Sequence, residues 1–284
     1  MKFETWKDII NSDKESINLI GYGSIINDRT TIESKVDDSE YIVKGFERNF
    51  TSSYDKKQCK ADSEKNKMFT ECAKEELENP LLLRNNLTYL NNSGAFNIIK
   101  NKEKFFNGIM ITIKRKDFKK YSLREKDYHL IKVNALKLPK ERKEKYNIEM
   151  PNELFEKIAA YVVIIPQKEL IMNADPFYLY YKSTRNGAFR KGLSFLETFD
   201  NTCFHNNELA YKYIMKKFYP YNKKVKIIST MTTQELLYEI PEHIMKYGEE
   251  GIVINHTLTM LEVMFKDGKK LYFDMNDIAA VSDN

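Results

Sequence analysis

The hydrophobic positions in the first half of the chain fall in short runs separated by charged segments, a pattern typical of strands. The run at 17–20 leads into a glycine pair and predicts a buried strand that ends in a tight turn. The run at 41–50 is rich in β-branched and aromatic residues, and Gly45 within it predicts a bulge or a close backbone approach. Further strands are predicted at 95–99, 107–113, 129–138 and 161–165, and helices at 3–11 and 116–122.

Two charged segments interrupt these runs. The segment 55–80 is rich in Lys, Glu, Asp and Asn and ends at Pro80, so we interpret it as a solvated helix and loop inserted in the domain. The segment 139–150 is interpreted as a charged loop.

The chain beyond residue 170 is predicted to be mainly helical. Asp175-Pro176 suits a helix start, because Asp can cap free backbone donors and proline fits the first helical position. We expect two helices after it, broken near Asn186-Gly187 and ending near Phe199, and another over 207–218.

The last sixty residues have local signals of their own. A helix is expected over 232–247, with Pro241 as a kink or a break and Gly248 at its end. The Asp-Gly pair at 267–268 lies between two apolar segments and predicts a hairpin over 261–273.

The order of these elements gives the fold class. Strands and helices do not alternate regularly, which favours an α+β fold over a doubly wound sheet. We expect a domain over 1–202 with a charged insertion at about 51–92, followed by a helical and hairpin extension over 203–284.

Composition excludes several classes of protein. Hydrophobic residues make up 42% of the 284 residues, which is enough for a packed core. The net charge of +5 is small, and acidic residues interrupt the basic clusters, which argues against nucleic-acid binding. The N-terminus lacks the apolar region of a signal peptide, and no apolar run is long enough to span a membrane.

The numbers and spacing of the cysteines and histidines argue against disulfide bonds and against a zinc site. Cys59, Cys72 and Cys203 are an odd number without metal-like spacing, as expected for free thiols of a cytoplasmic protein. The four histidines are scattered, so a dedicated zinc site is not expected.

Two segments could carry chemistry. In the segment 21–26, which reads Gly-Tyr-Gly-Ser-Ile-Ile, the two glycines let main-chain donors approach a small anion or a carboxylate. In the second segment, Glu125 stands at the end of a helix or turn just before a strand. A partly desolvated carboxylate in such a place can both accept and donate a proton. From composition alone the alternatives stay open, namely a strand-end turn and a surface ion pair of Glu125 with Arg124 or Lys126.

The order of several motifs resembles the γ-glutamylcyclotransferase-like superfamily, including its ChaC-type and AIG2-like branches, over residues of about 17–202. The loop after the first strand resembles that family's Tyr-Gly-Ser-Leu motif, with Ile in place of Leu. Two departures bear on the substrate: Tyr121-Ser122 stands where the family often has an aspartate, and the insertion at 51–92 is long. The motifs are Tyr22-Gly23-Ser24-Ile25, Gly45-Phe46-Glu47-Arg48-Asn49-Phe50, Asn107-Gly108-Ile109-Met110-Ile111, Arg124-Glu125-Lys126-Asp127-Tyr128, Tyr178-Leu179, Gly187-Ala188 and Gly192-Leu193-Ser194-Phe195-Leu196.

The resemblance implies a small mixed β-barrel surrounded by helices and an enzyme of lyase or acyltransferase chemistry that releases 5-oxoproline. It implies that Glu125 is the catalytic acid and base and that no metal or organic cofactor is needed. The substrate would be a γ-glutamyl amino acid, peptide or amine, with glutathione among the candidates. The residues expected to bind it are Tyr22, Gly23, Ser24, Ile25, Arg48 and Tyr128.

Two other readings remain open. The first is a non-catalytic member of the fold that binds a small γ-glutamyl-like ligand, because fold alone does not fix function. The second is a protein-interaction role of residues 203–284, which would also fit a homodimer.

Overall fold

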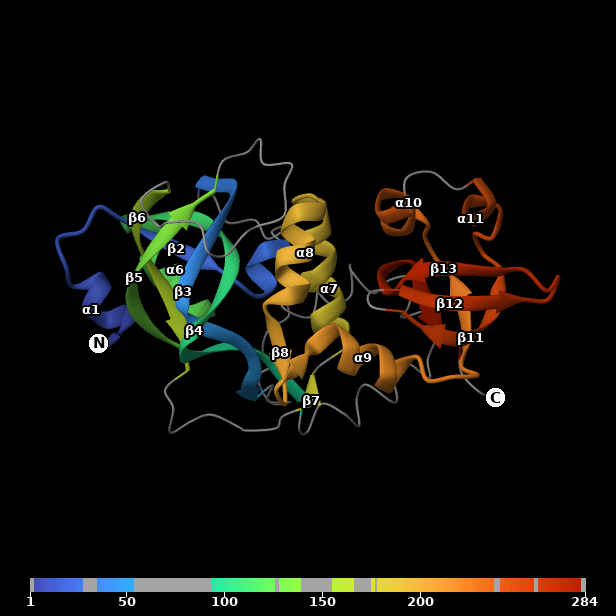
Figure 1. The fold of residues 1–284 in the computed structure, drawn as a ribbon. Helices are drawn as coiled ribbons and strands as arrows, with labels where there is room; N and C mark the ends of the chain where they lie inside the picture. The colour runs from blue at the N-terminus through green and yellow to red at the C-terminus, as the bar shows by residue number, and fades with distance from the viewer. Residues whose placement is uncertain are drawn as a thin grey trace.

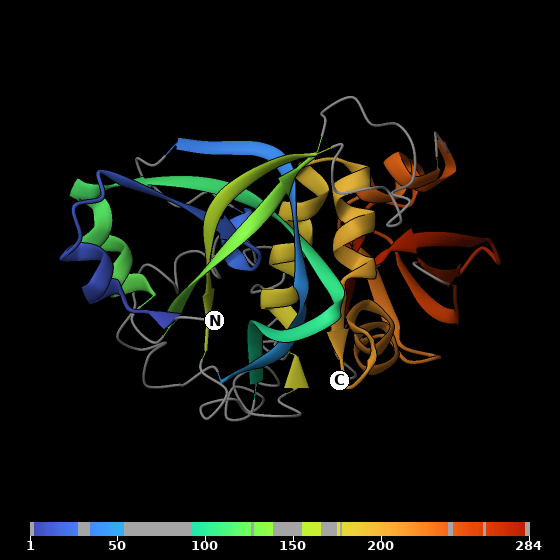
Figure 2. The ribbon, with the colours of Figure 1, turned by 60° about the vertical axis from the view of Figure 1, so that its left-hand side comes forward.

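The computed structural model describes residues 3–27, 35–53, 93–125, 128–138, 155–165, 175–176, 178–237, 241–257 and 260–281. Strands form two sheets, and the helices α7 and α8 lie between them in both views (Figures 1 and 2). The expected insertion lies almost entirely outside the described residues, as does the whole of the expected loop at 139–150.

The larger sheet is mixed and runs in the order β1-β5-β6-β2-β4-β3-β8-β9, with β7 paired to β4. β2–β6, β3–β8 and β4–β7 are parallel pairs, and the other pairs are antiparallel. β3 also pairs with β5, so the sheet curls back on itself. Its strands are β1 (Phe3–Glu4), β2 (Ser16–Gly21), β3 (Lys35–Ser53), β4 (Ser93–Lys114), β5 (His129–Lys137), β6 (Glu156–Ile164), β7 (Asp175–Pro176), β8 (Cys203–His205) and β9 (Glu208–Leu209).

The second sheet, here named the C-terminal sheet, is antiparallel and runs in the order β13-β12-β11-β10-β14. The hairpin expected at its Asp-Gly pair is confirmed, and Gly268 at its tip has a φ of 80°, which glycine adopts readily. Its strands are β10 (Lys224–Ile227), β11 (Glu250–His256), β12 (Met260–Phe265), β13 (Lys270–Asp274) and β14 (Ile278–Ala280).

The helices fill the space around and between the sheets (Figure 1). Near the N-terminus, Thr5 and Asp8 form a capping box at the start of α1, and Trp6 stacks on Tyr121 of α6 at 6.2 Å. The helices are α1 (Trp6–Ile10), η1 (Ser24–Asn27), η2 (Arg115–Asp117), α6 (Phe118–Arg124), α7 (Tyr178–Arg190), α8 (Leu193–Asn201), α9 (Ala210–Phe218), α10 (Met231–Leu237), α11 (Pro241–Met245) and η5 (Met275–Asp277).

The mixture of a large mixed sheet with helices confirms the α+β class, and several local expectations are confirmed with it. Gly45 lies at a register shift in β3 with a φ of 88°, as expected for a bulge. The helix expected over 232–247 is split into α10 and α11, with Pro241 as the first residue of α11.

Other expectations were wrong. The two strands expected at 95–99 and 107–113 are one long strand, β4. Asp175-Pro176 does not begin a helix but pairs as β7 with the start of β4, and the helix begins at Tyr178. The break expected near Asn186-Gly187 falls instead at Gly192, where a φ of 110° favours glycine.

The structure also contains strands that the sequence patterns did not predict. β8 pairs with β3, so residues just after 202 belong to the larger sheet. The C-terminal sheet begins only after α9, at β10. The division into a domain and an extension therefore stays a proposal, and the sheets favour a boundary after Phe218.

Within the described ranges, no helix is both long enough and apolar enough to cross a membrane.

Candidate active site

The end of β2 places the glycine-containing loop. A Cβ atom at Gly108 of the neighbouring strand β4 would lie 2.4 Å from the backbone oxygen of Gly21, so this close approach requires glycine. The next residue, Tyr22, is buried, and its hydroxyl donates a hydrogen bond of 2.8 Å to the backbone oxygen of Val163 on β6. Ile25 is buried in η1, so the loop is anchored on both sides of Gly23.

Glu125 ends helix α6. Its backbone N–H donates to the oxygen of Tyr121 at 2.9 Å, and the N–H of Tyr128 donates to the Glu125 oxygen at 3.0 Å, which turns the chain into β5. Although Glu125 lies in a charged run, its side chain is only 8% exposed. Glu125 is therefore a buried carboxylate and not an exposed one, and the side chains of Arg124 and Lys126, its partners in the alternative ion pair, lie outside the described part of the chain.

Three of the predicted site residues, Glu125, Arg48 and Tyr128, lie within electrostatic reach of the Tyr22 hydroxyl. Burial raises the pKa of Tyr22 well above its ordinary value, and the neighbouring ionisable side chains of Tyr128, Tyr180 and Glu125 raise it further. The positive charge of Arg48 acts in the opposite direction. Residues from three other parts of the sequence thus lie within electrostatic reach of the Tyr22 phenol.

Arg48 is the buried cation of this neighbourhood. It alternates with Phe46 and Phe50 on β3, and all three side chains are buried on one face of the strand. Burial lowers the pKa of Arg48 to about 10, although nearby ionisable groups, with Cys203 first among them, raise it.

The guanidinium of Arg48 is only partly satisfied. Its Nη2 donates to the backbone oxygen and to Oδ1 of Asn107, whereas Nε and Nη1 have no hydrogen-bond partner among the described residues. Its Cζ lies 4.5 Å from the ring centre of Phe199 and within 6 Å of those of Phe96 and Phe106. A buried cation with donors to spare suits an anionic ligand group.

Tyr180 of α7 belongs to this neighbourhood but was not predicted. A Cβ atom at Gly23 would lie 2.5 Å from its hydroxyl oxygen, so the phenol lies directly against the loop. Its ring packs on Phe96 at 5.4 Å. Tyr180 is one of 18 tyrosines, and the sequence offers no signal that separates it from its neighbours in α7.

The remaining predicted residues are less informative. Tyr128 is half-buried, and Ser24 begins η1 with a side chain that the structure does not describe. In the described part of the chain, no three His, Cys, Asp or Glu side chains gather as a metal site would require.

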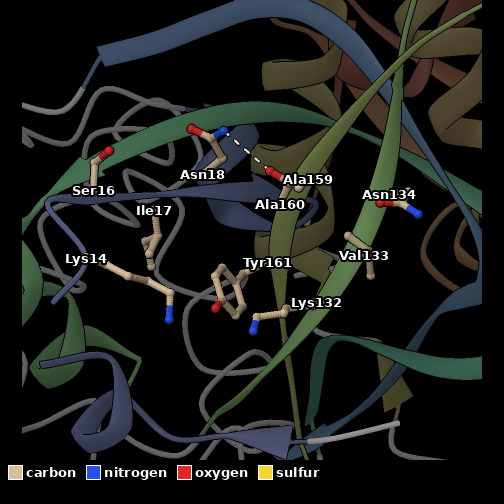
Figure 3. Close-up of a pocket in the computed structure, with 10 residues that line it drawn as sticks. All are labelled: Lys14, Ser16, Ile17, Asn18, Lys132, Val133, Asn134, Ala159, Ala160 and Tyr161. Atoms are coloured by element: carbon tan, nitrogen blue, oxygen red, sulfur yellow. Dashed lines mark hydrogen bonds between the residues drawn. The ribbon is translucent and has the colours of Figure 1, made fainter. Parts of the chain in front are cut away.

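A surface hollow of about 510 Å³ lies elsewhere, on the N-terminal side of the pairing of β2 and β6 at Leu19 and Tyr161 (Figure 3). The side chains of Lys14, Lys132 and Tyr161 point toward one another at its lower edge in this view. The hollow lies toward the amino ends of β2 and β6, whereas the loop of Tyr22 follows their carboxyl ends.

The charges of this hollow are already balanced in part. The carboxylate of Glu4 lies 2.9 Å from the Lys132 ammonium and 3.7 Å from that of Lys14, and it accepts a hydrogen bond from the Tyr161 hydroxyl. The hollow is therefore not the predicted site.

Comparisons with known proteins add the following. No protein-family model matches the sequence, and no curated protein matches it. A search of solved structures finds a γ-glutamyl cyclotransferase at 12% identity, covering 68% of this chain and 91% of that chain with a TM-score of 0.39. It also finds a γ-glutamyl cyclotransferase from yeast that is described as specific to glutathione, at 12% identity, covering 69% and 100% with a TM-score of 0.38.

γ-Glutamyl cyclotransferases are among the structural neighbours of this chain. An uncharacterised protein from Homo sapiens is another, at 12% identity, covering 69% and 92% with a TM-score of 0.39. TM-scores below 0.5 at this identity do not transfer an activity or a substrate. The function is therefore argued from the residues of this chain.

Proposed function

We propose that this protein is a γ-glutamylcyclotransferase-type enzyme that cyclises a γ-glutamyl amino acid, peptide or amine. The free α-amine of the glutamyl group attacks its own γ-carbonyl carbon. The new C–N bond closes the ring of 5-oxoproline, and the bond from that carbon to the attached amine breaks. Because the attack is intramolecular, holding the substrate in a folded conformation supplies much of the rate advantage.

Proton transfers accompany this reaction, and Glu125 is proposed to carry them. The substrate ammonium must lose one proton before it attacks, and the ring nitrogen must lose a second once the new C–N bond has formed. The leaving amine gains one of these protons as it departs and the other as it becomes an ammonium. A single buried carboxylate can accept and donate protons in turn, so no proton is gained or lost overall. The burial of Glu125 beside Tyr22 supports this role.

The negative charges of the substrate would be held by the loop and by Arg48. The backbone N–H groups of Tyr22, Gly23, Ser24 and Ile25 are proposed to stabilise the substrate carboxylate or the developing oxyanion. Arg48 is proposed to pair with the α-carboxylate through the donors that lack a partner among the described residues. Tyr128 is proposed to orient the substrate through its hydroxyl.

One observation carries the proposal. Glu125 is a buried carboxylate, and Arg48 is a buried guanidinium with two nitrogens that lack a partner among the described residues. Both influence the pKa of Tyr22, the residue that directly follows β2. Such a pair gives a proton carrier and an anion site in one place, which is what the cyclisation needs.

The experiment is 5-oxoproline release from a panel that contains glutathione, γ-glutamyl dipeptides and γ-glutamyl-ε-lysine. The wild-type protein is compared with Glu125→Gln, and circular dichroism checks that the variant is folded. We expect release by the wild type and a loss of at least about 100-fold in the variant, the usual contribution of a general acid–base group. The substrate with the highest kcat/KM then identifies the leaving amine.

A second result would favour a different function. If the folded wild type releases no 5-oxoproline from any member of the panel, the cyclotransferase proposal fails. Binding of a γ-glutamyl compound that weakens in Arg48→Met but not in Glu125→Gln would then indicate a non-catalytic ligand-binding protein. The unpartnered donors of Arg48 are the observation that favours this alternative.

A further inference from the structure

Helix α7 has one face directed at the C-terminal sheet. Tyr178, Lys182 and Arg185 follow one another at spacings of four and three residues, which places them on one side of the helix. All three are buried, and each has a partner beyond α8. The Lys182 ammonium donates 3.0 Å to the backbone oxygen of Ile278, and the hydroxyls of Tyr178 and Tyr219 form a hydrogen bond.

Arg185 makes the strongest of these contacts. Its Nη1 and Nη2 donate to the two carboxylate oxygens of Asp274, at the end of β13, at 2.5 and 2.9 Å. Its Nε and Nη2 donate to Asp200 of α8. All three charged side chains are at most 6% exposed, so the guanidinium links two carboxylates inside the protein.

The same helix carries Tyr180 to the candidate active site. The Tyr180 ring packs on Phe96 of β4, and its hydroxyl lies against Gly23. Helix α7 lies between the two sheets (Figure 1). It bonds to the C-terminal sheet on one side, and on the other side its Tyr180 phenol contacts the loop at Gly23. A shift of α7 relative to the larger sheet would move that phenol.

We propose that the C-terminal sheet fixes helix α7 through Arg185 and Asp274 and thereby positions the Tyr180 hydroxyl at Gly23. Arg185 and Asp274 are positioning residues in this arrangement, because they act through Tyr180. Ion pairs of fixed geometry suit this role better than apolar contacts, which tolerate sliding. The consequence for catalysis rests on the proposed cyclotransferase function, whereas the consequence for Tyr180 does not.

The test compares Asp274→Asn with Asp267→Asn. Asp267 is a matched control, because it lies in the connection between β12 and β13 and pairs with Lys246 at 2.7 Å. Each aspartate also accepts a hydrogen bond from the backbone N–H two residues later, Asp267 from Lys269 and Asp274 from Asn276. Each variant therefore loses an ion pair and a backbone hydrogen bond, but the pair of Asp274 is buried whereas Asp267 is half-exposed, and only Asp274 bonds to α7.

The first measurement needs no activity. The full-length protein is labelled with 3-fluorotyrosine, the ¹⁹F resonance of Tyr180 is assigned with Tyr180→Phe, and amide hydrogen exchange of α7 is followed. We expect Asp274→Asn to shift or broaden the Tyr180 resonance and to speed exchange in α7 about tenfold or more, because it weakens a buried ion pair. Asp267→Asn should change neither. A folded Asp274→Asn with unchanged Tyr180 resonance and α7 exchange would overturn the proposal, as would equal effects of the two variants.

Lys182→Met provides a second variant if Asp274→Asn does not fold. It removes the ammonium, which donates to Ile278 and lies 5.9 Å from the ring centre of Tyr178, and keeps an aliphatic stem. We expect a smaller change of the same two signals, and an unchanged Tyr180 resonance would contradict the proposal.

The second measurement concerns the reaction. If Asp274 acts through Tyr180, Asp274→Asn lowers kcat/KM for 5-oxoproline release in the wild-type background but not in Tyr180→Phe. An equal loss in both backgrounds would refute the positioning role while leaving the cyclotransferase proposal intact. Absence of release in the wild type refutes the cyclotransferase proposal, and the fluorine and exchange results then decide the role of Asp274 alone.

Discussion

The Tyr180 hydroxyl lies against Gly23 so closely that a Cβ atom there would be 2.5 Å from the phenol oxygen. The next nearest atoms, Cβ of Phe96 at 3.6 Å and Cζ of Tyr180 at 3.8 Å, are at ordinary contact distances. One hydroxyl group is therefore what excludes a side chain at Gly23. This relationship joins the loop after β2 to helix α7, two elements far apart in the sequence.

We expect Gly23→Ala to destabilise the protein by about 1–3 kcal/mol, the usual cost of overpacking. Tyr180→Phe removes the clashing oxygen, so the double variant Gly23→Ala/Tyr180→Phe should regain most of that loss in urea unfolding. Tyr181→Phe is the control, because the Tyr181 hydroxyl bonds to Asp200 instead. Equal rescue by Tyr181→Phe would show that the hydroxyl of Tyr180 is not the obstacle.

Arg48 and Arg185, both buried, should differ in how much stability is lost when their charge is removed. Arg185 is fully paired, and Arg185→Met leaves two aspartates buried without their partner, so we expect a loss of about 3–5 kcal/mol. Arg48→Met loses its bonds to Asn107 but also relieves an incompletely satisfied buried charge. We therefore expect a loss of no more than about 1 kcal/mol.

The same Arg48→Met should nevertheless lower kcat/KM about 10- to 100-fold, because a charge-assisted hydrogen bond to the substrate carboxylate is lost. Urea unfolding and 5-oxoproline release on the same preparations separate the two effects. A large loss of stability with unchanged kcat/KM would make Arg48 a structural residue and remove it from the proposed site.

Tyr22 should remain protonated well above pH 10. Its pKa in the folded protein is raised by burial and by neighbouring negative charge, so its contribution to stability is present below pH 10 and is lost as the pH rises through the folded pKa. In a spectrophotometric titration up to about pH 11, the native wild type and native Tyr22→Phe should form the same number of tyrosine phenolates. In urea, the unfolded wild type should form one more phenolate than unfolded Tyr22→Phe. A difference in phenolate number between the two native proteins would contradict the burial of Tyr22.

The sequence predicted those parts of the fold that local chemistry determines. The Asp-Gly pair specifies its hairpin, and Gly45 marks its bulge, because each needs a backbone conformation that few residues adopt. The strands β10 and β14 were missed because Val225 pairs with Ala280, more than fifty residues away, and no local pattern contains that partner. The helix start predicted at Asp175-Pro176 was wrong for the same reason, because these residues pair with Ser93 and Gly94, which lie far away in the sequence.

In the candidate site, too, the residues that lie in local motifs were predicted, whereas one that depends on long-range packing was not. Glu125 and the loop of Tyr22 were predicted because they lie in short motifs with recognisable order. The burial of Arg48 follows from its alternation with Phe46 and Phe50, which a closer look at side-chain periodicity would have indicated. Tyr180 was not predictable, because its role depends on how α7 packs between two sheets.

The pairing of β3 with β5, which curls the larger sheet back on itself, should be sensitive to acid. Beside it, Asp37 accepts hydrogen bonds from Lys137 at 2.8 Å, from the Tyr41 hydroxyl and from the Ser39 N–H, each at 2.9 Å. Partial burial acts to raise the pKa of Asp37, but these bonds outweigh it and hold the pKa well below its usual value. The stability from Asp37 is therefore fully present above about pH 4 and is lost as the pH falls through the folded pKa.

Asp37→Asn should lower the free energy of unfolding at pH 7 by about 1 kcal/mol, a value kept small by the partial exposure of the pair. The difference from wild type should shrink as the pH is lowered from 5 toward 2, because the unfolded wild type takes up a proton at Asp37 in this range whereas the folded protein keeps the carboxylate charged. Lys137→Met is the control for the partner. It should reproduce the loss at pH 7 and reduce the effect of adding Asp37→Asn. A difference that stays constant down to pH 2 would mean that the charge of Asp37 does not stabilise this pairing.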